Sequence, residues 1–398
     1  LRPLPTPCQR LGEGPHTKKP LAPVPSQPGL YIHIPFCKTK CPYCDFYSIN
    51  ATSQIPDFLV ALDAEARLYR DQFSAFDSLF LGGGTPSWLG EAHLADLMKN
   101  LRRHFPFAPD SEVTIEANPD DLTADKLALL QDLGINRLSL GVQSFDEAEL
   151  IFLQRRHTAR QTEAGIELIR AAGFTNLGLD LIYGLPGQRP DAWINTLKTA
   201  LRFNPEHLSC YQLTVADATP LEQRVAAGQV LLPDEETQRE FFLLTGQFLK
   251  AQGYLHYEVA NFARGQEYRC RHNLKYWTHV PYLGLGPAAH SFQGGRRWWN
   301  VSSVEAYCAS LKGGGVPVAG AESLTPAQLW LEALYLGFRT QAGVSLETIR
   351  AHPQGEAIVA ELTHAGLVRL EAGRVRATAQ GLVVADGLPL WFGEEVGD

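Results

Sequence analysis

Residues 31–46 read YIHIPFCKTKCPYCDF and contain the most informative pattern in this chain of 398 residues. An apolar run leads into Cys37, Cys41 and Cys44, which form a C-x3-C-x2-C pattern. Three thiolates at this spacing can hold three irons of a 4Fe-4S cubane and leave the fourth iron without a protein ligand. A zinc site is the alternative, but it needs four ligands and usually two C-x2-C pairs, and the sequence has no second pair. The pattern therefore favours an iron–sulfur cluster in a loop directly after a strand.

The composition narrows the functional classes further. The formal net charge of -8 opposes a general nucleic-acid or anionic-membrane surface, because both need clustered positive charge. The chain has seven cysteines, an odd number, and four of them lie far from the pattern and from one another. A disulfide framework would be spread along the chain and even in number, so metal chemistry in a reducing compartment fits better.

The N-terminal region gives an expectation for localisation. Residues 1–28 hold eight prolines and almost no hydrophobic periodicity, which predicts a disordered tail. This region lacks the apolar core of a secretory signal, and no stretch of the chain is apolar for long enough to span a bilayer. We therefore expect a cytoplasmic protein.

Short β-rich runs alternate with longer amphipathic runs from Leu30 onward. Repeated strand-then-helix units predict parallel strands with right-handed crossovers, in an open doubly wound sheet or in a full or partial barrel. The predicted strands are 30–34, 78–81, 112–117, 137–140, 177–182 and 207–213. The predicted helices lie near 55–70, 91–104, 123–133, 160–172, 190–202 and 235–252.

Polar or glycine-rich segments follow five of these strands directly. In a barrel, the carboxyl ends of the strands form one rim, where active sites are built. Five such segments in succession are hard to explain as turns alone. The predicted fold is therefore α/β, and the rim favours closure of the strands into a full or partial barrel. The five segments are Cys37–Cys44, Gly82–Pro86, Glu116–Pro119, Gly141–Ser144 and Gly184–Gln188.

The pattern changes after the barrel. Residues 256–320 form an irregular, aromatic- and histidine-rich extension, and 321–398 show three helical patterns followed by a hairpin around 371–373. Three helices and a hairpin are typical of a small, mostly helical, winged-helix-like module. Residues 325–398 contain five Lys/Arg and nine Asp/Glu, a net of -4, which opposes contact with nucleic-acid phosphates. We expect a docking or lid module and no nucleic-acid partner.

The cysteine segment resembles the radical SAM motif of the oxygen-independent coproporphyrinogen oxidase group. The resemblance rests on His33–Cys37 and Cys41–Phe46, runs from about Tyr31 into the C-terminal module, and is strongest with the heme chaperone branch, HemW. It implies an α/β fold, a partial (β/α)6 TIM-like radical SAM barrel over 29–255. In this barrel the open iron would chelate the amino and carboxylate groups of S-adenosylmethionine (SAM).

The resemblance also implies which rim residues bind SAM. Gly83, Gly84 and Thr85 would lie along the methionine amino group, where glycine lets the backbone approach closely. Arg155 would pair with the SAM carboxylate, although Arg156 beside it leaves the register uncertain by one. The other implied residues are Tyr31 and Tyr43 beside the cluster, Glu116 and Gln143 at the methionine and ribose portions, and Asp180 at the ribose hydroxyls.

Residues 270–277 contain the pattern H-N-x-x-Y-W, which resembles the heme-binding signature of the chaperone branch. A porphyrin needs a flat aromatic surface and an imidazole or thiolate as axial ligand. In the alternative interpretation, the segment packs the barrel against the C-terminal module and His272 is a hydrogen-bonded structural imidazole. The candidates for heme contact are His272, ahead of Cys270 as ligand, with Asn273, Tyr276 and Trp277.

The expected function is that of a heme chaperone, which binds 4Fe-4S, SAM and heme and delivers heme to respiratory apo-proteins. A homodimer and peripheral contact with membrane-bound acceptors would be compatible with this role. The alternative is an oxygen-independent coproporphyrinogen III oxidase, but those enzymes carry a further cysteine where this chain has Phe46. Another radical SAM enzyme, with a purely structural H-N-x-x-Y-W segment, is a third possibility. The resemblance implies a protein that is able to cleave SAM reductively.

Overall fold

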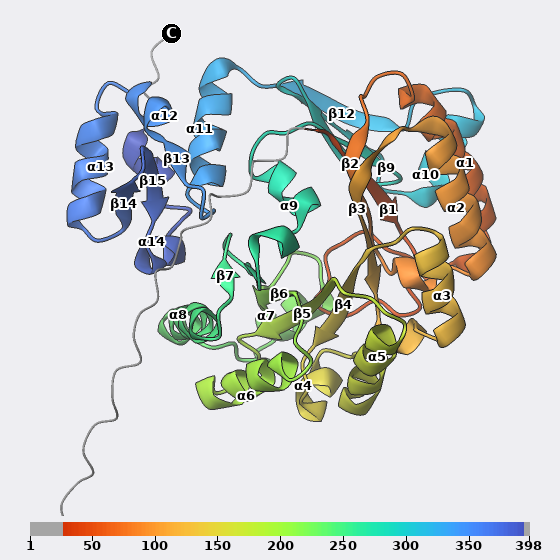
Figure 1. The fold of residues 1–398 in the computed structure, drawn as a ribbon, viewed down its shortest axis with the longest axis horizontal. Helices are drawn as coiled ribbons and strands as arrows, with labels where there is room; N and C mark the ends of the chain where they lie inside the picture. The colour runs from red at the N-terminus through yellow and green to blue at the C-terminus, as the bar shows by residue number, and fades with distance from the viewer. Residues whose placement is uncertain (1–26, 394–398) are drawn as a thin grey trace, which may run out of the picture.

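Six parallel strands form the centre of the molecule (Figure 1). The computed structural model describes residues 27–393, so the predicted disordered tail lies, up to residue 26, outside the described residues. The six strands are neighbours in one sheet in the order in which they occur in the chain. A doubly wound sheet would instead reverse its order at a switch point, so the barrel prediction is confirmed. The strands are β1 (Gly29–Ile34), β2 (Phe76–Gly83), β3 (Phe107–Ala117), β4 (Arg137–Gln143), β5 (Leu177–Tyr183) and β6 (His207–Gln212).

Helices cover the outer face of this curved sheet (Figure 1). Each presents an apolar stripe to the strands, as in α5, where Ile166 and Ile169 are fully buried. Capping residues set where the helices begin: Thr158 and Gln161 form a capping box at the start of α5. Within residues 27–393, no helix combines the length and apolar character needed to cross a bilayer. The helices are α1 (Ile55–Tyr69), α2 (Glu91–His104), α3 (Ala124–Asp132), α4 (Glu147–Phe152), α5 (Ala159–Ala171) and α6 (Pro190–Leu201).

Additional strands pair with both edges of the six-stranded barrel. One edge strand, β1, pairs in parallel with β9, and the other, β6, pairs antiparallel with β8. The barrel is therefore partial, as predicted, and becomes the centre of a twelve-stranded sheet. The segment that the sequence suggested was irregular supplies β7 (Leu255–His256), β8 (Asn261–Ala263), β9 (Tyr282–Leu285), β10 (His290–Gln293), β11 (Arg296–Asn300) and β12 (Val318–Ser323).

Four more helices complete this part of the chain. Helix α9 contacts β1 and β2, and α10 packs against α1. Helix α8 follows the last barrel strand and packs against α6. Their bounds are α7 (Pro220–Ala226), α8 (Glu235–Ala251), α9 (Arg271–Tyr276) and α10 (Val304–Lys312).

The C-terminal module has a small core of its own, in which Leu334, Phe338 and Leu362 are fully buried. It joins the extension after the barrel through a backbone bridge between Glu258 and Thr340. The predicted three helices and hairpin are present, and a third short strand completes the sheet β13-β15-β14. The elements are α11 (Pro326–Gly337), β13 (Val344–Ser345), α12 (Leu346–Arg350), α13 (Gly355–His364), β14 (Val368–Glu371), β15 (Arg374–Ala377) and α14 (Ala379–Val383).

Candidate functional site

The carboxyl ends of the barrel strands open into one cavity of about 1540 Å³. The five polar segments predicted to share a rim follow these strand ends, and four of them contribute residues to the cavity. Tyr31 is the one predicted SAM residue that does not line it, and the structure describes all of them. The predicted residues that line the cavity are Cys37, Cys41, Tyr43, Cys44, Gly83, Gly84, Thr85, Glu116, Gln143, Arg155 and Asp180.

The three cysteines lie on a loop that is fixed at both ends. The Cys37 amide donates to the Ile49 carbonyl at 2.9 Å, and the Ile49 amide donates to the Pro35 carbonyl at 2.7 Å. The three thiols are half-buried and form no disulfide. Burial raises the pKa of the Cys44 thiol to about 11. A bound iron would counter this effect, because coordinated thiols lose their proton.

The arrangement of the thiols suits a cluster better than a single ion. Among residues 27–393, no three His, Cys, Asp or Glu side chains converge as a single metal ion requires. A cubane binds each thiolate at a separate iron, so its cysteines need not converge on one point. Three separate thiols facing one cavity therefore fit a 4Fe-4S cluster.

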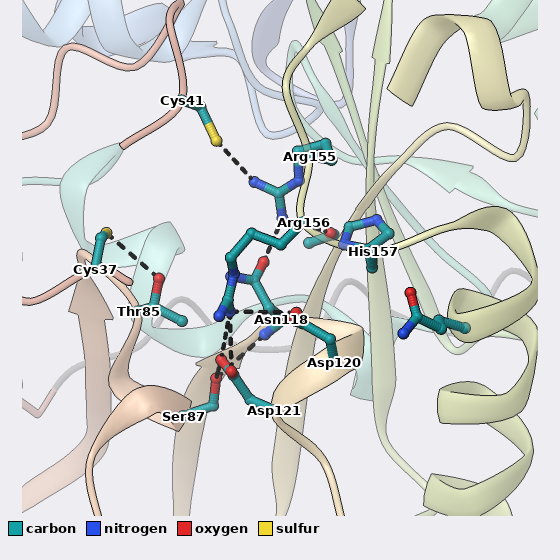
Figure 2. Close-up of polar contacts among 12 residues, drawn as sticks. Cys37, Cys41, Thr85, Ser87, Asn118, Asp120, Asp121, Arg155, Arg156 and His157 are labelled. Atoms are coloured by element: carbon teal, nitrogen blue, oxygen red, sulfur yellow. Dashed lines mark hydrogen bonds and ion pairs between the residues drawn. The ribbon is translucent and has the colours of Figure 1, made fainter. Parts of the chain in front are cut away.

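Two neighbouring arginines have different partners (Figure 2). Arg155 Nη1 lies 3.2 Å from Cys41 Sγ, and its Nη2 donates to the Gly141 carbonyl at 2.9 Å and to Asn118. Its buried Nε has no hydrogen-bond partner in the described part of the chain. Arg156 instead donates to both carboxylate oxygens of Asp121 at 2.9 Å. Both arginines line the cavity, but the charge of Arg156 is compensated by Asp121, whereas Arg155 forms no ion pair within the described residues. This difference favours Arg155 as the partner of a carboxylate.

Two half-buried acids, Glu116 and Asp180, face the same cavity. Glu116 Oε2 accepts a hydrogen bond from the Gly83 amide at 3.1 Å, and Asp180 accepts one from Ser139 Oγ at 3.0 Å. Burial and the nearby charge of Asp180 raise the pKa of Glu116 to about 8, and burial raises the pKa of Asp180. A cationic ligand would relieve both effects. SAM carries an ammonium and a sulfonium group, so these acids fit it.

The glycines predicted to line the SAM site also hold the cluster loop. The Gly84 amide donates to the Ile34 carbonyl and the Thr85 amide to the Phe36 carbonyl, each at 2.8 Å. A Cβ atom on Gly84 would lie 2.7 Å from the Phe36 oxygen, so no larger residue fits without a backbone shift. Gly83 has a φ of 108°, which favours glycine.

Gln143 also has an unusual backbone. Its φ is 66°, beside an irregularity in the pairing of β4 with β5. Left-handed residues other than glycine carry strain and gather at functional sites. This position at the cavity is consistent with the predicted role of Gln143.

The residues predicted to contact heme lie outside the cavity. His272 is buried, and its Nδ1 is 3.0 Å from Ser78 Oγ and its Nε2 is 2.8 Å from the Tyr276 hydroxyl. Ser78 lies opposite Gly29, the first residue of β1. Five residue steps of about 3.3 Å separate that level from the end of β1, so His272 lies roughly 16 Å below the rim. Burial lowers the pKa of His272 to about 3, which keeps the imidazole neutral.

The neighbours of His272 share this buried setting. Cys270 caps α9, because its Sγ accepts from the Asn273 amide at 3.5 Å. Burial raises the pKa of Cys270 to about 12. Trp277 ends the helix and is half-buried. Tyr31, which was expected beside the cluster, packs near the His272 ring, and its hydroxyl lies 3.1 Å from His33 Nδ1.

The structure adds cavity residues that the sequence did not assign. Asn118 holds Arg155, and its position in the predicted rim segment after β3 was the available signal. Other residues come from α8 and from the end of α14, where no local pattern pointed to the site. These include Arg239, Phe242, Leu382–Ala385 and Asp386.

Comparison with known proteins agrees with this geometry. The radical SAM superfamily model matches residues 31–200, and the HemN C-terminal domain model matches 324–384. The heme chaperone HemW of Mycobacterium tuberculosis H37Rv is 38% identical over 92% of this chain and 95% of its own length. HemW of Bacillus subtilis 168 is 35% identical over 92% of this chain and 99% of its own.

A solved structure has the same fold. Coproporphyrinogen III oxidase (HemN) from Escherichia coli, described as a radical SAM enzyme, superposes with a TM-score of 0.79 at 25% identity and covers 94% of this chain and 91% of its own. Relatives with the chaperone name are more similar in sequence and span almost the whole chain. The chain therefore belongs to the radical SAM superfamily and, within it, to the HemW family.

Proposed function

We propose that this protein is a heme chaperone, which binds a 4Fe-4S cluster, SAM and heme and delivers heme to respiratory apo-proteins. Membership of the radical SAM superfamily implies the cluster and SAM. The observation that carries the proposal is the one cavity in which the cysteine loop, Arg155, Glu116 and Asp180 meet. The family relationship supplies the heme part, because the relatives that span most of this chain are named heme chaperones.

The chain's own residues have separate roles in this proposal. Cys37, Cys41 and Cys44 hold the cluster, which when bound supplies an electron able to cleave SAM. Arg155 pairs with the SAM carboxylate, since it lines the cavity and its two terminal nitrogens are held in place by Cys41 and Gly141. Glu116 receives the cationic part of SAM, and Asp180 receives the ribose hydroxyls.

The segment around His272 is one candidate for heme contact. Both imidazole nitrogens are engaged, so ligation by His272 requires the ring to give up its hydrogen bond to Ser78 or its hydrogen bond to Tyr276. Ligation by Cys270 requires a thiol with a pKa of about 12 to lose its proton. Ligation of heme by either residue would therefore require a rearrangement of α9 at the amino-terminal end of the barrel strands.

The second candidate function is oxygen-independent oxidation of coproporphyrinogen III. The similarity to the E. coli HemN structure favours it, since the whole fold is shared. Phe46 opposes it, because the resemblance to those enzymes calls for a cysteine at this position. Phe46 is 61% exposed at the cavity wall and offers no thiol there.

The cytoplasm is the proposed location, with heme-accepting apo-proteins as partners, and contact with membrane-bound acceptors would be peripheral. A homodimer is compatible with this role. The acceptors can be sought by mixing heme-loaded protein with respiratory apo-proteins and following the transfer of absorbance.

Anaerobic cluster reconstitution followed by hemin titration tests the function. We expect stoichiometric heme uptake, read by absorbance, and no vinyl product when coproporphyrinogen III is supplied with SAM and a reductant. The matched control replaces Cys37, Cys41 and Cys44 together with alanine, which removes the cluster. Robust decarboxylation without heme uptake would identify the biosynthetic enzyme instead.

A further inference from the structure

The cavity is larger than one small ligand needs. Its volume is about 1540 Å³, whereas sites for a single small ligand measure about 300–1,000 Å³. The barrel side contains the cysteine loop, Arg155, Glu116 and Asp180, which together fit SAM and a cluster. The remaining walls come from the loop after the cysteines, from β6, from α8 and from the C-terminal module. We call this second part the outer compartment; it is lined by Phe46, Tyr211, Phe242, Val384, Arg239 and Arg339.

Apolar and aromatic side chains are unusually open to solvent in the outer compartment. Phe46 is 61% exposed, Tyr211 is 43% exposed and Val384 is 44% exposed. Phe242 lines the same space from α8. Exposed large apolar groups that gather at one concave site mark a binding surface. Aromatic and aliphatic walls suit a flat conjugated ring.

Two arginines of the outer compartment are only weakly neutralised. Arg239 Nη1 pairs with Glu236 at 3.0 Å, and Arg339 pairs with Asp386. The side chains of these two acids are 80% and 83% exposed, so both pairs contribute little to stability. A ligand carboxylate that is shielded from water would compete well for either guanidinium. Asp234 and Glu235 also line the cavity, so attraction at these two points, and not a general positive field, would orient the ligand.

We propose that heme binds in the outer compartment, next to the SAM site, with its ring against Phe46, Tyr211, Phe242 and Val384 and its propionates on Arg239 and Arg339. This inference rests on the proposed chaperone function and moves the heme site from α9 to the cavity. Among the described residues, no histidine lines the cavity. Heme is therefore held by its face and its carboxylates without an imidazole ligand, which suits a carrier that must release it.

Hemin titration of the reconstituted full-length chain tests the site. In Val384→Trp the larger side chain occupies the compartment, and in the double variant Arg239→Gln/Arg339→Gln the propionate partners are removed. We expect each to raise the hemin dissociation constant at least tenfold while SAM affinity stays near that of the unaltered chain. The matched control is Arg189→Gln, since Arg189 forms a similarly exposed pair with Asp191 and does not line the cavity.

The same titration on Trp277→Ala separates the two heme sites. Unchanged hemin affinity in Trp277→Ala, together with weakened binding in the arginine double variant, supports the outer compartment. The reverse pattern would overturn this inference and leave the chaperone function standing with heme on α9. If the unaltered chain binds no hemin, the proposed function itself fails. The arginine variant changes only exposed or half-buried side chains, so the test does not depend on whether Val384→Trp folds.

Discussion

The Arg155 guanidinium touches the Cys41 thiol, with 3.2 Å between Nη1 and Sγ (Figure 2). Gly141 and Asn118 hold the second terminal nitrogen of the same side chain. The guanidinium therefore has a fixed orientation at the junction of the cluster loop and the cavity. A group held in this way loses little side-chain entropy when it binds a carboxylate.

Replacement of Arg155 by glutamine should weaken SAM binding. Hydrogen bonds to charged groups contribute about 1.5–3 kcal/mol, which corresponds to a loss of about 10- to 100-fold in affinity. Equilibrium SAM binding to the anaerobically reconstituted protein measures this loss. Arg156→Gln is the matched control: it breaks the pair with Asp121, so it should lower stability with little effect on SAM affinity. Equal losses of SAM affinity in both variants would contradict the assignment.

Gly84→Ala should destabilise the protein and reduce cluster loading. Its Cβ would press on the Phe36 oxygen, directly before Cys37, and overpacking of this kind costs about 1–3 kcal/mol. Gly246→Ala is the control, because Gly246 lies within α8 and its nearest neighbour to a new Cβ is 3.5 Å away. Gly246→Ala should leave the stability of the protein unchanged or raise it. Thermal unfolding and the visible absorbance of the reconstituted cluster give the two readouts, and unchanged cluster absorbance in Gly84→Ala would count against this role.

The barrel could be predicted from the sequence because its signals are local. Apolar runs of strand length and helical periodicity placed the six strands and their helices close to where they lie. The shared rim followed from a topological rule, since parallel strands put their carboxyl ends together. The cavity-lining positions of Cys37, Glu116 and Asp180 could be expected for the same reason.

The features that were missed depend on contacts between distant parts of the chain. His272 is held by Ser78, 194 residues away, and nothing near either residue indicates this pairing. Strands β9–β12 are short, and their order follows from pairing on the exposed edge of β1. The choice between Arg155 and Arg156 depended on where Asp121 would lie. The adjacent acids Asp120 and Asp121 were the signal that could have assigned Arg156 to a structural pair.

The stability of the cofactor-free protein should fall as the pH rises from about 6.5 to 8, above the range in which the buried His272 titrates. The pKa of Glu116 is raised from 4.5 to about 8, so in this range the folded state binds a proton that the unfolded state has released. Each pH unit in this range then lowers the free energy of unfolding by up to about 1.4 kcal/mol for this one group. Glu116→Gln should make the dependence shallower, as measured by chemical denaturation at several pH values.

Part of the slope should survive in Glu116→Gln, because burial also raises the pKa of Glu65 and of Glu258 to about 7. SAM should reduce the slope of the unaltered protein, since its positive charges stabilise the ionised carboxylate. A slope identical in Glu116→Gln and in the unaltered chain would show that Glu116 is ionised throughout.

Replacement of His272 by alanine should lower the stability of the folded protein. It leaves Ser78 and Tyr276 without a partner and opens space beside Phe80, at a cost of about 2–5 kcal/mol. The imidazole also makes the protein less stable in acid. Burial lowers the pKa of His272 from 6.5 in the unfolded state to about 3 in the folded state, so between these pH values only the unfolded state binds the proton. The free energy of unfolding therefore falls as the pH drops from 6.5 to 3. His272→Gln, which can keep one hydrogen bond, should lose less stability than His272→Ala and show a shallower acid dependence than the unaltered chain. Denaturation curves between pH 6.5 and 3 measure both effects. If His272→Ala abolished hemin binding while the unfolding free energy of the variant stayed that of the unaltered chain, the imidazole would be a heme ligand and not a structural residue between α9 and the barrel.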